Sequence, residues 1–185
     1  MKKHIVTACL YTAITAILLG LVYPLLITGL ARLAFPAKAN GSLITRNGEV
    51  IGSHLIGQPF TGPNYFHSRP SAAGTGYDAA NSSGSNLAPT SKALIDRVNA
   101  SVATEATATP VPVDLVTASA SGLDPDITPA AALYQVPRLA SQRGLSEATL
   151  RQLVLGHIKP RQFGLLGEPT VNVLDLNLAL DQLKP

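Results

Sequence analysis

Near its N-terminus the chain carries an uncharged apolar run, Ile5-Val-Thr-Ala-Cys-Leu-Tyr-Thr-Ala-Ile-Thr-Ala-Ile-Leu-Leu-Gly-Leu-Val-Tyr-Pro-Leu-Leu-Ile-Thr-Gly-Leu-Ala31. As an α-helix this run would be roughly 40 Å long, against a bilayer hydrocarbon core of about 30 Å. Backbone amides within lipid must bond inside the segment, so a helix is the only form available to a single span. The run therefore predicts one transmembrane helix, with a kink at Pro24, where a helical hydrogen bond is lost.

A secretory signal peptide is the alternative reading of this run. A basic start at Lys2 and Lys3 and an Ala-x-Ala at 37–39 both fit a signal peptide. The apolar part of a signal peptide is about 7–15 residues long, however, and this run is nearly twice that. We therefore expect the segment to be retained as an anchor. Its orientation stays open, because Arg32 and Lys38 on one flank nearly balance the basic residues on the other.

One face of the predicted helix has small side chains at every fourth position: Ala8, Thr12, Ala16 and Gly20. Small residues let two helix backbones approach closely, which is a principal way in which helices associate in lipid. This stripe predicts a packing face for a helix of another membrane protein.

The charges of the chain are divided unevenly. Of 185 residues, 14% are charged and 46% are hydrophobic, and the net charge is +3. Before Phe35 the only ionic residues are Lys2, Lys3 and Arg32, so the remainder carries 11 basic and 11 acidic residues. A neutral folded part offers no basic patch for nucleic acid. The single cysteine, Cys9, excludes an intramolecular disulfide and a cysteine-based zinc site.

These patterns predict an α+β fold class: a single N-terminal transmembrane helix followed by one mixed α/β domain. We place the anchor with its short tail at 1–34, a connector at 35–41 and the soluble domain at 42–185. Within the domain, Asn47-Gly48 between two apolar stretches predicts a β-hairpin with a type I′ turn. Residues 58–86, rich in Gly, Ser, Pro and Asn, should be mostly loop.

Further elements follow from capping signals and periodicity. A helix should begin at Thr90 or Ser91, followed by a mobile Ala/Thr linker over 101–109 and a strand over 111–116. Thr128-Pro129 predicts a helix start, and this helix runs to Arg143 with a kink at Pro137 and a stop at Gly144. Ser146 should cap a helix that ends at Leu155. Residues 170–181 could start as a strand and finish as a short helix, but periodicity does not settle their second half.

A search for catalytic motifs finds little. The sequence has no Gly-x4-Gly-Lys-Ser/Thr phosphate loop, no Gly-x-Ser-x-Gly nucleophile elbow and no Asp-Lys-Thr-Gly-Thr phosphorylation site. An anchored hydrolase using Ser or Asp residues therefore has no motif behind it. The scattered histidines, the Asp124-Pro125-Asp126 turn and ion pairs from Arg69 and Arg138 to Asp114 or Asp124 are interpreted as structural.

Taken together, several segments resemble a known family, the C subunit of the Kdp potassium-importing P-type ATPase. The resemblance begins with the anchor and its Tyr23-Pro24 and continues in the family's order across nearly the whole chain. The resembling stretches are Gly52-Ser-His-Leu-Ile-Gly-Gln-Pro-Phe, Tyr65-Phe-His-Ser-Arg-Pro-Ser-Ala, Ser83-Gly-Ser-Asn-Leu, Pro112-Val-Asp-Leu-Val-Thr-Ala-Ser-Ala-Ser-Gly-Leu-Asp-Pro, Tyr134-Gln-Val-Pro-Arg and Val171-Asn-Val-Leu-Asp-Leu-Asn-Leu-Ala-Leu-Asp.

The resemblance implies a non-enzymatic, single-pass subunit of a bacterial inner-membrane complex. Its expected partners are a channel-like chain that binds potassium and a P-type chain that hydrolyses ATP. The N-terminus would be cytoplasmic and the domain extracytoplasmic. No metal and no firmly bound cofactor are expected.

The resemblance also implies a chaperone-like effect that raises the ATP affinity of the hydrolysing chain, through a transient complex with ATP. The side chains nominated for that contact are Gln135, whose amide can bond a base edge, and Arg138, which can grip phosphate. An extracytoplasmic domain cannot touch cytoplasmic ATP, so the effect would then be indirect. The alternative is a membrane-anchored nucleotide-binding subunit whose domain faces the cytoplasm.

Overall fold

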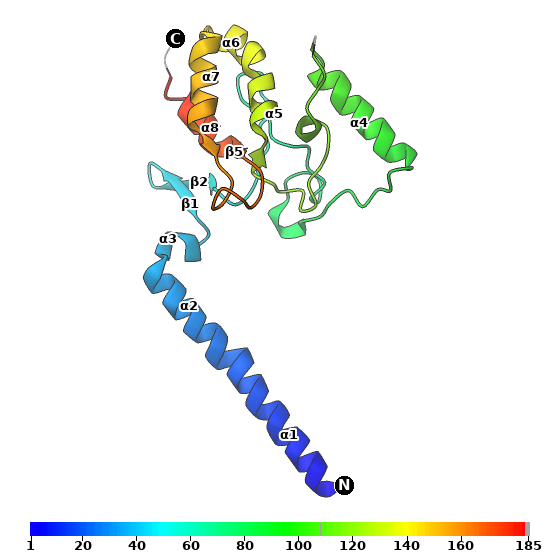
Figure 1. Cartoon of the computed structure of the whole chain (residues 1–185), viewed down its shortest axis with the longest axis vertical. Helices are drawn as coiled ribbons and strands as arrows, with labels where there is room; N and C mark the ends of the chain where they lie inside the picture. The colour runs from blue at the N-terminus through cyan, green and yellow to red at the C-terminus, as the bar shows by residue number, and fades with distance from the viewer. Residues whose placement is uncertain (108, 184–185) are drawn as a thin grey trace. The chain divides into compact units, whose positions relative to one another are not determined.

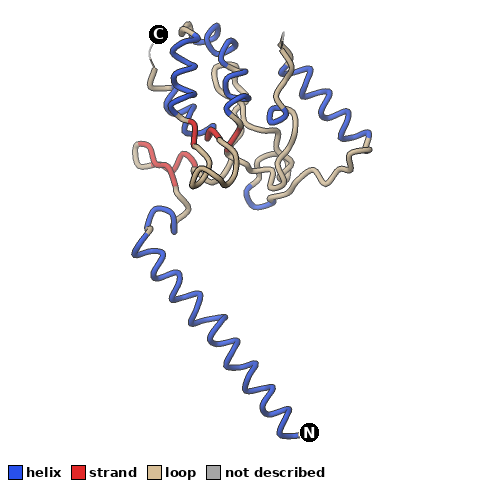
Figure 2. Tube along the Cα trace, viewed as in Figure 1, coloured by secondary structure: helices blue, strands red, loops and turns tan. Residues whose placement is uncertain are grey.

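The computed structural model describes residues 1–107 and 109–183. The chain divides into two compact units, Met1–Leu43 and Ile44–Pro185, and each is described by itself. Figure 1 shows the elements along the chain, and Figure 2 shows how much of the second unit is loop.

The first unit is one long apolar helix. It consists of α1 (Lys2–Ile17), a π-helical turn η1 (Leu18–Val22) and α2 (Tyr23–Ala34), followed by the short α3 (Pro36–Ala39). The helix Lys2–Ala34 has 33 residues, its most apolar 18-residue window has a mean hydropathy of 2.3, and it is long and apolar enough to cross a membrane. The π-helical turn ends two residues before Pro24, whose ring would clash with the carbonyl of Gly20 in a regular α-helix. The disturbance predicted at Pro24 takes this form.

The second unit begins with the predicted hairpin. Strand β1 (Leu43–Arg46) and strand β2 (Glu49–Ser53) form a two-stranded sheet. Asn47 and Gly48 between them have φ angles of 55° and 85°. Positive φ at both central positions is what a type I′ turn requires, so the hairpin prediction is confirmed.

A long irregular segment and one exposed helix follow the hairpin. The segment contains only a short 3-10 turn, η2 (Ala79–Asn81), as its composition predicted. Helix α4 (Lys92–Glu105) begins after Ser91, as predicted. The linker predicted from residue 101 was wrong at its start, because the helix continues to Glu105, whose backbone carbonyl accepts a bond from the Tyr134 hydroxyl. Residue 108 of that predicted linker lies outside the described residues.

The strand predicted over 111–116 was also wrong. The chain forms a 3-10 turn there, η3 (Val113–Leu115). The Asp114 carboxylate accepts a bond from the Thr128 N–H at 2.8 Å, and the side chain of Leu115 enters the core. These two anchors curl the segment instead of extending it.

Three helices confirm the capping signals of the sequence. The segment predicted to kink at Pro137 is divided at Gln135 into α5 (Pro129–Tyr134) and α6 (Val136–Arg143). Thr128 caps α5, and Gly144, at φ 66°, ends α6 in the left-handed region. Helix α7 (Glu147–Gly156) begins after its cap, Ser146.

A small antiparallel sheet lies beside these helices. Its order is β3 (Asp126–Ile127), β5 (Thr170–Asn172), β4 (Ile158–Lys159). Helix α8 (Val173–Leu180) follows β5 directly, so the second half of 170–181, which periodicity left open, is helical. Helices α5 and α8 both contact β5, and both also contact α7 (Figure 1). The fully buried large side chains of this core include Phe66, Ile127, Leu139, Leu150, Val154, Val171, Leu176 and Leu180.

The irregular segment is held to the helices by two buried side-chain amides. Asn177 accepts a bond from the Phe66 N–H at 2.9 Å and donates one to the Phe66 carbonyl at 3.0 Å. Gln135 likewise accepts a bond from the His67 N–H at 2.7 Å and donates one to the His67 carbonyl at 3.2 Å. The two amides occupy the backbone groups that a neighbouring strand would otherwise satisfy.

Candidate functional site

Two places in the chain carry the residues that the sequence nominated: a face of the long helix, and the break between α5 and α6. On the helix, Ala8, Thr12, Ala16 and Gly20 are all exposed. In a regular α-helix, a four-residue spacing drifts by about 40° at each step. The π-helical turn at Leu18–Val22 has more residues per turn, so it reduces this drift where Gly20 is reached.

Gly20 has space around it within the chain. A β-carbon added there would meet nothing within 4 Å, and the same holds for Gly29. Gly29 lies nine positions after Gly20, a separation that places the two on roughly opposite sides of the helix. They form a matched pair for testing the packing face.

The second place is centred on Gln135, which is 1% exposed. Its side-chain oxygen accepts bonds from the His67 N–H and from Arg138 Nη2, the latter at 2.9 Å. Its side-chain nitrogen donates to the carbonyls of His67 and Ala131. Both ends of the amide are therefore engaged inside the domain.

Arg138 lies beside Gln135, as the nomination required, but its partners differ from those predicted. It pairs with neither Asp114 nor Asp124; its guanidinium donates to the carbonyls of Pro63 and Tyr65. This pairing prediction was wrong for Arg138, because carbonyls of the irregular segment are its partners and the two carboxylates pair with Arg69 instead. Burial lowers the pKa of Arg138, which stays fully charged in any ordinary buffer.

Arg69 does make the predicted ion pairs. Its Nη1 lies 3.3 Å from Asp114 and 3.5 Å from Asp124. Asp124 also accepts a bond from the Asp126 N–H at 3.0 Å. The Asp124 side chain therefore makes a local turn-like bond just before β3, in agreement with its structural interpretation, and Arg69 joins it to Asp114 of η3.

A glutamate that the sequence did not single out completes the cluster. Glu105, at the end of α4, accepts a bond of 2.8 Å from His67 Nδ1. This hydrogen bond is the main reason that the pKa of Glu105 lies below its ordinary value, although partial burial opposes it. A hollow of about 270 Å³ is lined by seven residues here: Thr104, Glu105, Ala106, Thr107, Tyr134, Gln135 and Arg138. It is slightly smaller than typical ligand pockets, which begin near 300 Å³.

The histidines of the domain make separate contacts. His54 pairs with Asp175 at 2.7 Å, and His157 Nδ1 lies 2.7 Å from the Leu153 carbonyl. Among the residues that the structure describes, no three His, Cys, Asp or Glu side chains gather as a metal site would need.

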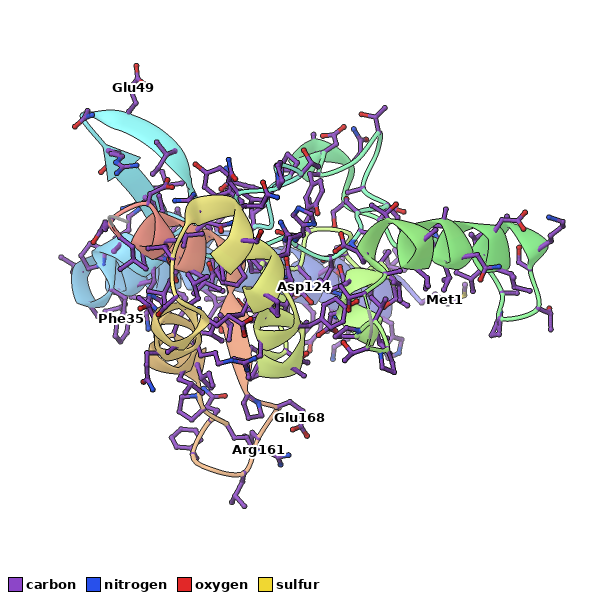
Figure 3. All side chains as sticks on the ribbon, turned by 90° about the horizontal axis from the view of Figure 1, so that it is seen from above. Met1, Phe35, Glu49, Asp124, Arg161 and Glu168 are labelled. Atoms are coloured by element: carbon purple, nitrogen blue, oxygen red, sulfur yellow. The ribbon has the colours of Figure 1, made fainter. Side chains whose placement is uncertain are left out.

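Sequence reasoning missed one surface feature. Residues 161–168, Arg-Gln-Phe-Gly-Leu-Leu-Gly-Glu, form a loop whose apolar side chains are exposed (Figure 3). The signal was present, since Phe163, Leu165 and Leu166 stand between a basic and an acidic residue with two glycines among them.

Fold and sites together define a class of protein: a small domain of helices and short strands that follows one helix long and apolar enough to span a bilayer. Comparison with known proteins identifies the family within that class. A family model described as "K+-transporting ATPase, c chain" matches residues 5–182, so the chain belongs to this family.

Individual relatives agree with the family model. The chain is 61% identical to the potassium-transporting ATPase KdpC subunit of Koribacter versatilis, over 100% of this chain and 97% of that one. It is 66% identical to the subunit of the same name from Acidobacterium capsulatum, over 98% and 99% of the two chains. It is 57% identical to that of Rhodopseudomonas palustris, over the full length of both. These matches confirm the resemblance seen in the sequence motifs.

Proposed function

We propose that the chain is an accessory, non-catalytic subunit that assembles and stabilises a potassium-transporting P-type ATPase. The observation that carries this proposal is the family match, which extends over both the apolar helix and the domain. Its partners are a channel-like chain that binds potassium and a chain that hydrolyses ATP. The sequence has no phosphate loop, nucleophile elbow or phosphorylation motif, which is in keeping with a non-catalytic role.

The helix face Ala8, Thr12, Ala16 and Gly20 is proposed to pack against a helix of one of those partners. Gly20→Leu adds a branched side chain where the chain itself leaves space, so only a partner would resist it. Full transporter is purified in detergent through a tag on the hydrolysing chain. Gly20→Leu is expected to lower co-purification at least fivefold, while the matched Gly29→Leu leaves it unchanged. Equal retention of both variants contradicts the packing face.

We place the N-terminus in the cytoplasm and the domain outside it, in a bacterial inner membrane. Long domains that follow a first helix translocate largely regardless of flanking charge, and this domain is neutral. Cys9 is the only cysteine, so Cys9→Ser gives a cysteine-free background. In that background Glu49→Cys, at the exposed hairpin, should react with a membrane-impermeant maleimide on sealed spheroplasts. Labelling only after lysis would place the domain in the cytoplasm.

The effect on ATP affinity is proposed to be indirect. The subunit would bind two states of the pump unequally and thereby favour the state that holds ATP more tightly, without touching the nucleotide. No cofactor is then bound firmly by this chain. Removal of the subunit from the reconstituted pump is expected to raise the KM for ATP by about 5- to 150-fold, which is the change in affinity that typical coupling free energies produce.

Direct contact with ATP through Gln135 and Arg138 is the competing hypothesis. Their polar atoms already serve the irregular segment, which argues against it. Saturable ATP binding by the isolated full chain in detergent, together with cytoplasmic labelling of the domain, would favour this alternative.

A further inference from the structure

The loop 161–168 is closed and ordered by its own hydrogen bonds. Arg161 Nη2 lies 2.7 and 2.6 Å from the two carboxylate oxygens of Glu168, across the base of the loop. Gln162 and Leu166 exchange two backbone hydrogen bonds of 2.9 Å each. Figure 3 shows the labelled Arg161 and Glu168 on this loop, which projects from the adjoining helices.

The tip of the loop presents apolar side chains to solvent. Phe163 is 86% exposed, Leu165 80% and Leu166 60%. The first two are the most exposed large hydrophobic side chains among the described residues of Ile44–Pro185. Phe163 also has a φ of 54°, in the left-handed region that a bulky side chain rarely adopts. A strained aromatic residue held away from its own core suits contact with another molecule better than it suits stability.

The charges around the tip are paired. Arg161 is occupied by Glu168, and Lys159 lies 3.9 Å from both Asp126 and Asp175. A loop that inserts into an anionic lipid surface normally carries free Lys or Arg beside its apolar residues. Because Arg161 and Lys159 are both paired with carboxylates, the surface around the apolar tip is neutral, which favours an uncharged pocket of a protein as its binding site.

We propose that the apolar tip Phe163–Leu166 docks into an uncharged, apolar pocket of another subunit of the transporter. This inference rests on the proposed function, because it requires that the chain assembles with other subunits. Aromatic residues that fill a partner's pocket commonly dominate the binding energy of an interface. The rigid base then presents a preorganised tip, so little conformational freedom is lost on docking.

Photo-crosslinking in native membranes tests the contact directly. A benzophenone amino acid replaces Phe163 in one variant and Val113, which is 68% exposed, in a matched control. Irradiation is expected to join the first variant to a transporter subunit, identified by mass spectrometry, in a yield several-fold above the control. Adducts with lipid only, with a second copy of this chain only, or at the control level would overturn the proposal.

A second variant separates docking from folding. Asn tolerates a positive φ, so Phe163→Asn should leave the melting temperature of the full chain unchanged or higher. The same substitution is expected to weaken binding to the remaining transporter by at least about tenfold. Undiminished binding would overturn the docking role alone. Wild-type chain that binds no transporter subunit would overturn the proposed function as well.

Discussion

Gln135→Ala is the substitution that best separates a structural amide from a nucleotide contact. In the wild-type domain, the Gln135 side chain is buried and bonds the N–H and the carbonyl of His67 as well as Arg138. Alanine leaves the His67 N–H without this partner, which costs about 1–3 kcal/mol. Loss of the packed side chain adds a cavity cost, so we expect a total of about 2–4 kcal/mol.

The expected change in melting temperature follows from the size of the unit Ile44–Pro185. An unfolding entropy of about 2.1 cal/mol/K per residue gives roughly 3 °C for each kcal/mol. Gln135→Ala should therefore lower the melting temperature by about 6–12 °C. Differential scanning calorimetry of the full chain in detergent, without nucleotide, measures this shift.

Gln142→Ala is the matched control, because Gln142 is exposed and lies on α6, the helix that begins directly after Gln135. It should change the melting temperature by less than about 2 °C, as surface substitutions commonly do. A Gln135→Ala chain that melts like the wild type would refute the structural role. Loss of an ATP response in such a stable variant would identify Gln135 as a ligand instead.

Three further outcomes follow from the described geometry. Gly122→Ala should destabilise the domain by about 2–4 kcal/mol, because φ is 66° and the new β-carbon would lie 2.5 and 2.6 Å from backbone atoms. Gly144 has the same φ of 66° but open space around it, so Gly144→Ala should cost only about 1 kcal/mol. Denaturant melts of the two variants measure both free energies of unfolding. His67→Ala should raise the pKa of Glu105 above its ordinary 4.5, because burial, which raises the pKa, then outweighs the charge of Arg138, which lowers it. An NMR titration of the carboxyl group would detect the change. The pKa of Glu105 is depressed in the folded wild-type chain, so the stability that this carboxylate contributes is present above about pH 4.5 and is lost as the pH falls below it. A His67→Ala chain should not show this loss of stability in acid when its melting is followed against pH. Thr128→Ala should cost about 1 kcal/mol through loss of the α5 cap, and an unchanged denaturation midpoint would contradict it.

Local signals predicted the elements that local chemistry determines. The Asn47-Gly48 turn, the Thr128 and Ser146 caps and the Gly144 stop all depend on residues within a few positions of one another. The predicted strand over 111–116 failed because its conformation depends on Thr128, which lies 14 positions from Asp114. Periodicity alone carries no information on such a distant partner.

The candidate site was predictable only in part. Sequence placed Gln135 and Arg138 close together, because both lie around one helix break. It did not reveal that the carbonyls of Pro63, Tyr65 and His67 would occupy them, since that requires the path of an irregular segment. The apolar loop 161–168 was missed because a short apolar run is equally compatible with a buried strand.

The amide of Asn177 sets the order in which this domain can be completed. Its bonds to Phe66 join residues 111 positions apart, and Asn177 lies near the end of a 185-residue chain. At a synthesis rate of about 5–20 residues per second, the segment around Phe66 leaves the ribosome several seconds before Asn177, its hydrogen-bond partner, does. During that interval the N–H and carbonyl of Phe66 lack the partner that they have in the folded domain, so the irregular segment cannot take its final place until α8 has been made.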